Sequence, residues 1–293
     1  MRSSLFLRPA LAAVASLGAV GCVAPPDDRP DAEATSSTAT AVVVVERTAG
    51  PGDAIRADAV IARFVRVRQG TVDDQALRIA GAAWDLPAVG ACSTDAQDRA
   101  ASQPALQSRT VELLDVGALT VESAGSRSYN AAKGTVLLPR TMPDPTGVVP
   151  GVFYSARSAE AFTPAARLQL NASGGADMPE GFRVDVASPR DVSDVRVAPG
   201  PGGAIDVSWE ADAASTEARD LVYVDVLGPS SHLVARCTAL DVGQLTVPAG
   251  LIGAGVHEGQ LAVHRMHREA FRTRGIDPGE IRFDLARVVA FHR

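Results

Sequence analysis

The segment that decides the fold reads Ile281-Arg282-Phe283-Asp284-Leu285-Ala286-Arg287-Val288-Val289-Ala290-Phe291. Apolar and polar residues alternate along it, and a period of two places successive side chains on opposite faces of a β-strand. The same alternation recurs in residues 59–68, 182–186, 205–209 and 221–226. The sequence therefore favours an all-β protein.

Turn signals separate these segments at intervals of eight to fifteen residues. They are Gly174-Gly175, the Pro/Gly run at 199–203, Gly228-Pro229 and Pro278-Gly279. Helical patterns are weak, with a turn or two expected at 95–106 and at 248–256. Many short strands punctuated by glycine and proline are typical of β-sandwiches or β-barrels, and we expect sandwiches.

An eight-residue phrase occurs twice, as Leu114-Asp115-Val116-Gly117-Ala118-Leu119-Thr120-Val121 and as Leu240-Asp241-Val242-Gly243-Gln244-Leu245-Thr246-Val247. Seven of the eight positions are identical, at an offset of 126. In each copy a strand would end, Asp and Gly would form a turn, and the next strand would begin. Coincidence between two ordinary turns is the alternative. We expect two like-built sandwich domains, at 41–187 and 188–293.

The N-terminus has the parts of an export signal. Arg2 and Arg8 precede a short apolar run at 9–18, and small residues lead to Cys22. This ending resembles a bacterial lipobox, which implies removal of residues 1–21 and diacylation of the Cys22 thiol, although Ala19 stands where the lipobox prefers Leu. An ordinary cleaved signal and a buried core helix are the alternatives.

Residues 22–40 have the composition of a disordered tether. They contain three prolines and four acids but no aromatic residue, so they cannot bury enough apolar surface to offset the entropy of ordering. Val23 occupies the position where Asp commonly marks retention in the inner membrane, so the lipobox resemblance implies the outer membrane. No later stretch has the apolar length of a transmembrane helix, and we expect anchoring by lipid alone.

Charge and cysteine content limit the possible partners. The formal net charge is −6, and loss of the two arginines in the signal brings the mature chain to −8. A nucleic-acid partner is therefore not expected, because such proteins need a basic face. Beyond Cys22 the chain has only Cys92 and Cys237, which either pair in an oxidising compartment or remain as two buried thiols.

The search for catalytic motifs gives mostly negative results. The chain has no Gly-x-Ser-x-Gly elbow, phosphate-binding loop or Ca²⁺ loop, and no cofactor is expected. His257, His264 and His267 fall within eleven residues, but Leu261 replaces the second histidine of a zincin motif. On a helix His264 and His267 would share a face, and on a strand they would lie on opposite faces. The alternatives are a metal site and a solvated strand with scattered imidazoles.

Two resemblances cover the later part of the chain. Val195-Arg196-Val197, 205–209 and 221–227 look like the first strands of a fibronectin type III or immunoglobulin-like domain, which implies that Trp209 packs between two sheets. The chain also resembles a group of uncharacterised surface lipoproteins of myxobacteria and related delta-proteobacteria. The resemblance lies in the order of short motifs at 174–182, 186–189, the Val-Ser-Trp strand, 235–237, 241–243 and 247–249. That resemblance implies an envelope location and a two-part β architecture, but no activity.

These observations favour a non-enzymatic cell-envelope lipoprotein, anchored at Cys22, that binds envelope proteins or surface polysaccharide. The alternative is a metal-dependent hydrolase that uses His257, His264, His267 and nearby acids. A carrier of lipids or small molecules would need a wide apolar cavity between its sheets.

Overall fold

The structure is a computed structural model that describes residues 38–50, 55–68, 70–94, 110–123, 135–141, 149–158, 167–212, 220–228, 231–253 and 255–292. The expected signal, Cys22 and nearly all of the expected tether lie outside the described residues, as does the expected helical turn at 95–106. Ser37–Arg293 form one compact unit.

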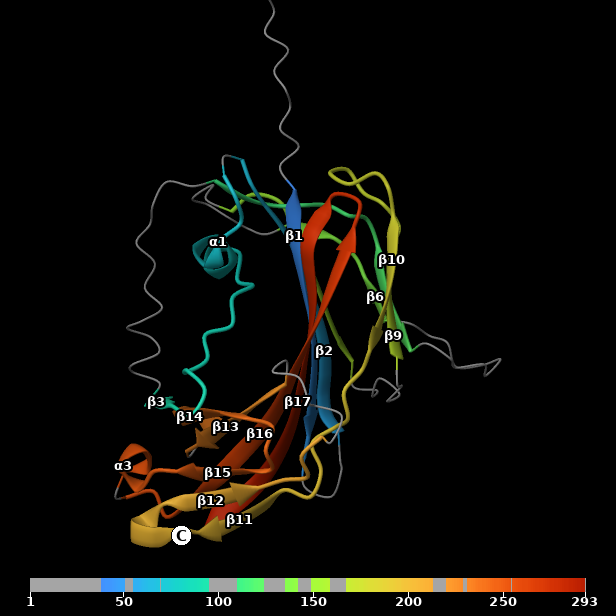
Figure 1. Cartoon of the computed structure of the whole chain (residues 1–293). Coiled ribbons are helices and arrows are strands. Elements are labelled where there is room, and N and C mark those ends of the chain that lie inside the picture. The colour runs from blue at the N-terminus through green and yellow to red at the C-terminus, as the bar shows by residue number, and fades with distance from the viewer. Residues whose placement is uncertain are drawn as a thin grey trace, which may run out of the picture. The chain divides into compact units, whose positions relative to one another are not determined.

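A ten-stranded sheet is the largest element of the fold (Figure 1). Its strand order is β3 (Cys92–Thr94), β14 (Leu233–Leu240), β13 (Leu221–Leu227), β16 (Glu258–Thr273), β17 (Ile276–His292), β1 (Ala39–Ala49), β2 (Ile55–Val67), β8 (Val152–Ser158) and β7 (Arg140–Thr141), with β4 (Val111–Leu113) also paired to β2. Its named strands pair antiparallel except β1 and β17, which pair parallel. We call it the long sheet.

Two smaller sheets complete the β structure of the described residues. One has the order β10 (Phe182–Ala187), β9 (Arg167–Ala172), β5 (Leu119–Ser123) and β6 (Thr135–Leu137), and the other has the order β11 (Arg196–Pro199), β12 (Ile205–Ser208) and β15 (Gln244–Val247). The described helical segments are short: α1 (Asp74–Ile79), the 3-10 turn η2 (Pro201–Gly203) and α3 (Ala249–Ile252).

Each smaller sheet packs against a different part of the long sheet. The four-stranded sheet contributes Leu170 to a first core that also contains Phe64 and Phe283. The three-stranded sheet contributes Val207 to a second core that also contains Trp209. The protein is therefore an all-β sandwich fold, as the alternating segments predict. Trp209 is 5% exposed between two sheets, where the resemblance to fibronectin type III domains places it.

The hairpin of β16 and β17 belongs to both cores. Phe271 and Ile281 pack in the first core, whereas Leu261 and Phe291 pack in the second. The long sheet thus crosses the boundary expected between residues 187 and 188, and a cut there would separate β17 from its parallel partner β1. The two sandwiches are distinct as cores but share one sheet.

Both copies of the repeated phrase carry the chain from the long sheet to a smaller sheet. The first copy connects β4 to β5, and the second connects β14 to β15. Gly117 and Gly243 have φ values of 80° and 84° in the two turns, a conformation that glycine adopts without strain. The phrase therefore occupies equivalent places in the two sandwiches.

Two local features differ from the sequence analysis. The turn expected at Pro278-Gly279 is wrong: both residues lie inside β17, and the hairpin turns at Gly275. Pro278 is accommodated because the register between β1 and β17 shifts opposite residues 276–279, and irregular positions tolerate a residue without an N–H. Helix α1 has no counterpart in the sequence analysis. It is capped by Asp73, which accepts a hydrogen bond from the Ala76 N–H, and Ala76 covers a third apolar cluster with Val42 and Val65.

Candidate functional site

His264 lies between two carboxylates on the face of the long sheet opposite to the second core. Its Nδ1 is 2.9 Å from Asp284 Oδ1, and its Nε2 is 3.9 Å from Asp225 Oδ2. The imidazole stacks on the Tyr223 ring with 4.2 Å between centroids and 13° between planes. Strand alternation explains the placement, because the neighbouring Val263 points into the second core.

Tyr223 and Arg236 complete this arrangement, which we call the His264 cluster. The Tyr223 hydroxyl donates to Asp284 Oδ2 at 2.7 Å. Arg236 donates to both oxygens of Asp225 at 2.7 and 2.8 Å, and its guanidinium lies 4.9 Å from the Tyr223 ring centroid. Trp84 packs against the same ring in a T-shaped arrangement, with 6.2 Å between centroids. The polar atoms of the cluster therefore satisfy one another across the four strands β14, β13, β16 and β17.

The cluster shifts the proton affinity of its members. Burial disfavours the charged imidazole of His264, but the negative charge and hydrogen bond of Asp284, together with Asp225, outweigh this and raise its pKa. Burial and the charge of Asp284 raise the pKa of Glu46 on the adjacent strand, against the opposing charges of Arg157 and His264. The cluster therefore favours a charged imidazolium that compensates two buried carboxylates.

His267 lies on the other face of the same strand. It contacts Asp220 through Nδ1, and its Nε2 is 3.1 Å from Glu269 Oε1. The hydrogen bond to Asp220 is the main reason that its pKa is raised. His257 lies exposed just before β16.

The three histidines are therefore not brought together, because a strand directs His264 and His267 to opposite faces. Among the described residues no three His, Cys, Asp or Glu side chains are grouped so that they could hold a metal ion. The shared histidine site that underlies the hydrolase alternative is not formed.

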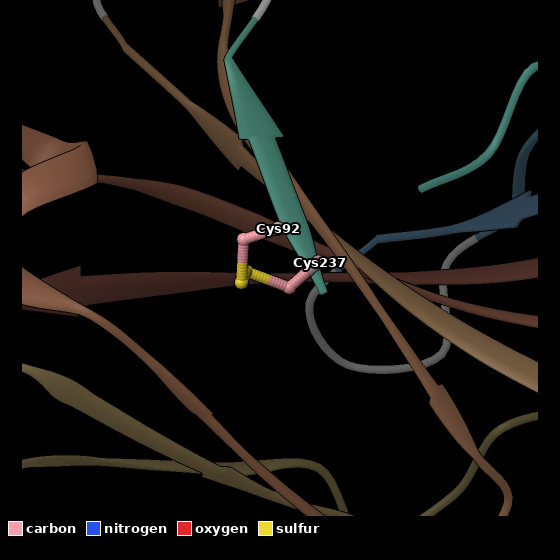
Figure 2. Close-up of a disulfide and its surroundings, with 2 residues drawn as sticks. All are labelled: Cys92 and Cys237. Atoms are coloured by element: carbon pink, nitrogen blue, oxygen red, sulfur yellow. A yellow bond between two sulfur atoms is a disulfide. The ribbon is translucent and has the colours of Figure 1, made fainter. Parts of the chain in front are cut away.

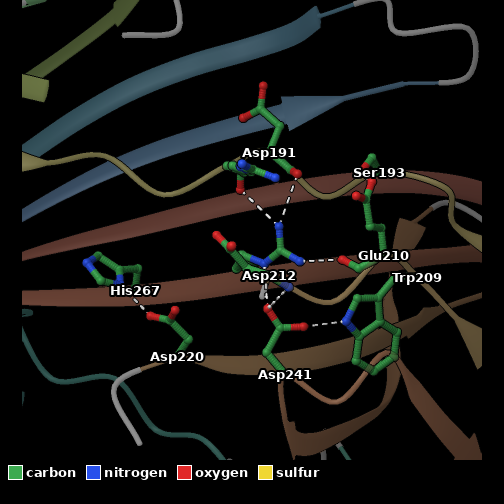
Figure 3. A network of polar contacts seen from close by, with 10 residues as sticks. Asp191, Ser193, Trp209, Glu210, Asp212, Asp220, Asp241 and His267 are labelled. Carbon is green, nitrogen blue, oxygen red and sulfur yellow. Dashed lines mark hydrogen bonds and ion pairs between the residues drawn. The ribbon is translucent and has the colours of Figure 1, made fainter. Parts of the chain in front are cut away.

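A second buried polar network surrounds Asp241 in the repeated phrase (Figure 3). Asp241 accepts hydrogen bonds from Trp209 Nε1 at 2.6 Å and from Arg265 Nε at 2.8 Å. Arg265 also donates to the carbonyl oxygens of Arg190, Asp191 and Glu210. The network ties the segment between β10 and β11 to the long sheet.

A small cleft lies beside this connecting segment. It has a volume of about 330 Å³ and is bounded by Arg47, Asp191, Asp194 and Arg287 among others. Arg47 already pairs with Asp58 Oδ1 at 3.2 Å and with Asp191 Oδ2 at 3.4 Å. Arg47 and Asp191 therefore help to hold the segment between β10 and β11 against the long sheet.

A larger groove of about 570 Å³ lies over the three-stranded sheet. The side chains that face it are polar apart from Ala198 in β11: Arg196 in β11, Asp206 and Ser208 in β12, and Gln244 and Thr246 in β15. Strand alternation puts them on the outer face, because Ile205, Val207 and Val247 point into the second core. This groove is the candidate interaction surface.

Cys92 and Cys237 form a disulfide between β3 and β14 (Figure 2). The two cysteines are directly opposite each other in the antiparallel pair. The bond closes a separation of 145 residues and holds the edge strand β3 to the long sheet.

The described helices include none that is long and apolar enough to cross a membrane. In comparisons with known proteins, no family model and no curated protein matches the chain. The candidate surfaces therefore rest on the geometry alone.

Most residues of the His264 cluster were missed by the sequence analysis. Tyr223, Asp225 and Asp284 occupy alternate positions of strands, where a polar residue normally faces water. Nothing in the sequence indicates that Trp84 packs on Tyr223, on the face of the long sheet that carries the His264 cluster. The acidic residues between Trp209 and β13 do not form one group: Asp220 contacts His267, the Asp212 N–H donates to Asp241, and Glu217 lies outside the described residues.

Proposed function

We propose that the protein is a non-enzymatic binding module of the cell envelope, held at the outer membrane by a lipid on Cys22. The observation that carries the proposal is the parallel pairing of β1 with β17. Through it the chain enters the fold at Ala39 beside Gly275, at the tip of the β16–β17 hairpin, while the second sandwich is built around the other end of that hairpin.

The polar side chains of the His264 cluster and of the network around Asp241 are already bonded to one another or to the backbone, which supports a binding role over a catalytic one. The imidazoles of His264 and His267 are held by carboxylates on opposite faces, and Arg265 and Asp241 hold backbone segments together. The shared sheet, the disulfide and these networks favour a firm scaffold that presents surfaces to a partner.

The proposal is tested by isolating tagged full-length protein from detergent-solubilised native envelopes, with Cys22→Ala as the control. We expect the wild-type chain to enter the detergent phase and the Cys22→Ala chain to remain in the aqueous phase. Equal partition of both chains would contradict the lipid anchor. Binding is then tested by titrating the full chain against a panel of neutral and anionic oligosaccharides.

A further inference from the structure

We propose that the outer face of the β11–β12–β15 sheet binds a short stretch of a neutral, hydroxyl-rich glycan chain. This inference rests on the proposed function, and it names the surface and the class of ligand. The groove of about 570 Å³ over this sheet falls within the size range of small-ligand sites.

The polar side chains of this face form rows across the strands. Arg196 is registered with Ser208, and Ser208 with Gln244. Adjacent strands are about 4.8 Å apart, so the row offers a guanidinium, a hydroxyl and an amide at intervals close to the length of one sugar ring. A glycan running across the strands could meet one such group at each successive residue.

The first row is also chemically available. Within the described part of the chain, Arg196, Ser208 and Gln244 make no side-chain hydrogen bond or ion pair. In the next row Thr246 donates to Asp206 Oδ1 at 2.6 Å, which leaves the second carboxylate oxygen of Asp206 as an acceptor. The face therefore offers both donors and acceptors, which is what sugar hydroxyls require.

The charge of the face selects a neutral ligand. Arg196 and Asp206 carry opposite charges, so a polyanion or a polycation would meet one like charge for each opposite one. Hydroxyl groups can donate to the carboxylate and accept from the guanidinium without that conflict.

The size of the face selects a glycan over a protein. Three strands of about four residues cover roughly 14 Å by 13 Å. A stable protein interface buries about 800 Å² on each partner, several times this area. A few sugar residues would fill the groove. Because the lining residues include no aromatic ring, binding depends on hydrogen bonds and is expected to be weak.

The position of the groove suits a surface polymer. Strand β17 has 17 residues and therefore spans about 55 Å. Its first residue pairs with Ala39, where the chain enters the fold, whereas Phe291 near its last residue packs in the second core. The groove thus lies over the sandwich farther from the attachment point, where a polymer outside the membrane can reach it.

The test uses the full chain with Cys22→Ala, titrated against immobilised cello-, xylo-, manno- and chitohexaose, with oligogalacturonate as a polyanionic comparison. We expect at least one neutral hexasaccharide to bind, and Arg196→Ala/Ser208→Ala/Gln244→Ala to weaken that binding at least tenfold. The matched control is Arg183→Ala/Asn171→Ala/Thr120→Ala. These residues form a registered row on the four-stranded sheet, but Arg183 there pairs with Asp185 and Asn171 donates to Gln169. The control variant should bind the hexasaccharide as tightly as the chain that carries Cys22→Ala alone.

The proposal is overturned by no binding to any neutral hexasaccharide, by undiminished binding of the Arg196→Ala/Ser208→Ala/Gln244→Ala variant, or by binding to the polyanion only. Capture of a stoichiometric envelope protein that is lost with the Arg196 row variant, without glycan binding, would make the face a protein interface and would also overturn it. Unchanged circular dichroism and melting temperature of both triple variants exclude misfolding. Failure of the glycan site leaves the detergent partition of the wild-type chain unaffected, so it is distinguishable from failure of the lipid anchor.

Discussion

Arg265 and Asp241 form a buried ion pair, with 2.8 Å between Nε and Oδ2 and with side chains 2% and 0% exposed. The pair joins a central strand of the long sheet to the second copy of the repeated phrase. Arg265 also donates to three backbone carbonyl oxygens. It thereby supplies the hydrogen bonds that these carbonyls would otherwise need from water.

Removing the charge of Asp241 should therefore destabilise the protein strongly. Asp241→Asn leaves the buried guanidinium without its counter-charge, and we expect a loss of about 3 kcal/mol in the free energy of unfolding. Urea denaturation measures this. Glu180→Gln is the control, since it removes one partner of the exposed Arg274–Glu180 pair and should change little. Equal shifts in the two variants would contradict the central role of the buried pair.

The stability contributed by His264 should depend on pH. Its folded pKa is raised above the ordinary value of about 6.5, so the contribution is complete below that pH and is lost as the pH rises through the folded pKa. We expect the difference in unfolding free energy between wild type and His264→Gln to shrink as the pH rises from 6 to 9. His292→Gln, at the exposed end of β17, controls for general histidine loss. A difference that stays constant with pH would refute this explanation.

Reduction of the Cys92–Cys237 disulfide should lower the melting temperature. The loop of 145 residues gives a chain-entropy stabilisation of at most roughly 5 kcal/mol. Thermal denaturation with and without a reductant measures the loss. The double variant Cys92→Ala/Cys237→Ala should melt near the reduced wild type and should not respond to the reductant. A reductant effect of the same size in both proteins would show that it acts elsewhere.

The two glycines of the repeated phrase should differ in their tolerance of alanine. Both have positive φ, which costs an alanine about 1–2 kcal/mol. At Gly117 a Cβ would also collide with the Gly174 carbonyl, whereas at Gly243 its nearest neighbour is the Trp209 carbonyl oxygen at 3.1 Å. Gly117→Ala should therefore be clearly the more destabilising change in urea denaturation. Equal losses would mean that the first turn can open to admit the methyl group.

The sequence alone was sufficient to predict the all-β class, because alternation with period two is a local property of each strand. Residues 281–291 indicate β17, and the positive-φ glycines of the repeated phrase follow from their turn sequence. Alternation also placed His264 and His267 on opposite faces once the segment is a strand.

Only the tertiary structure decided which strands pair and which faces are covered. The parallel pairing of β1 with β17 joins residues more than 200 positions apart, and no local pattern specifies such a partner. The same holds for the His264 cluster, since Tyr223, Asp225 and Asp284 follow the pattern of solvent-facing strand positions. Burial of a polar side chain depends on what packs above it, and that is a property of the whole fold.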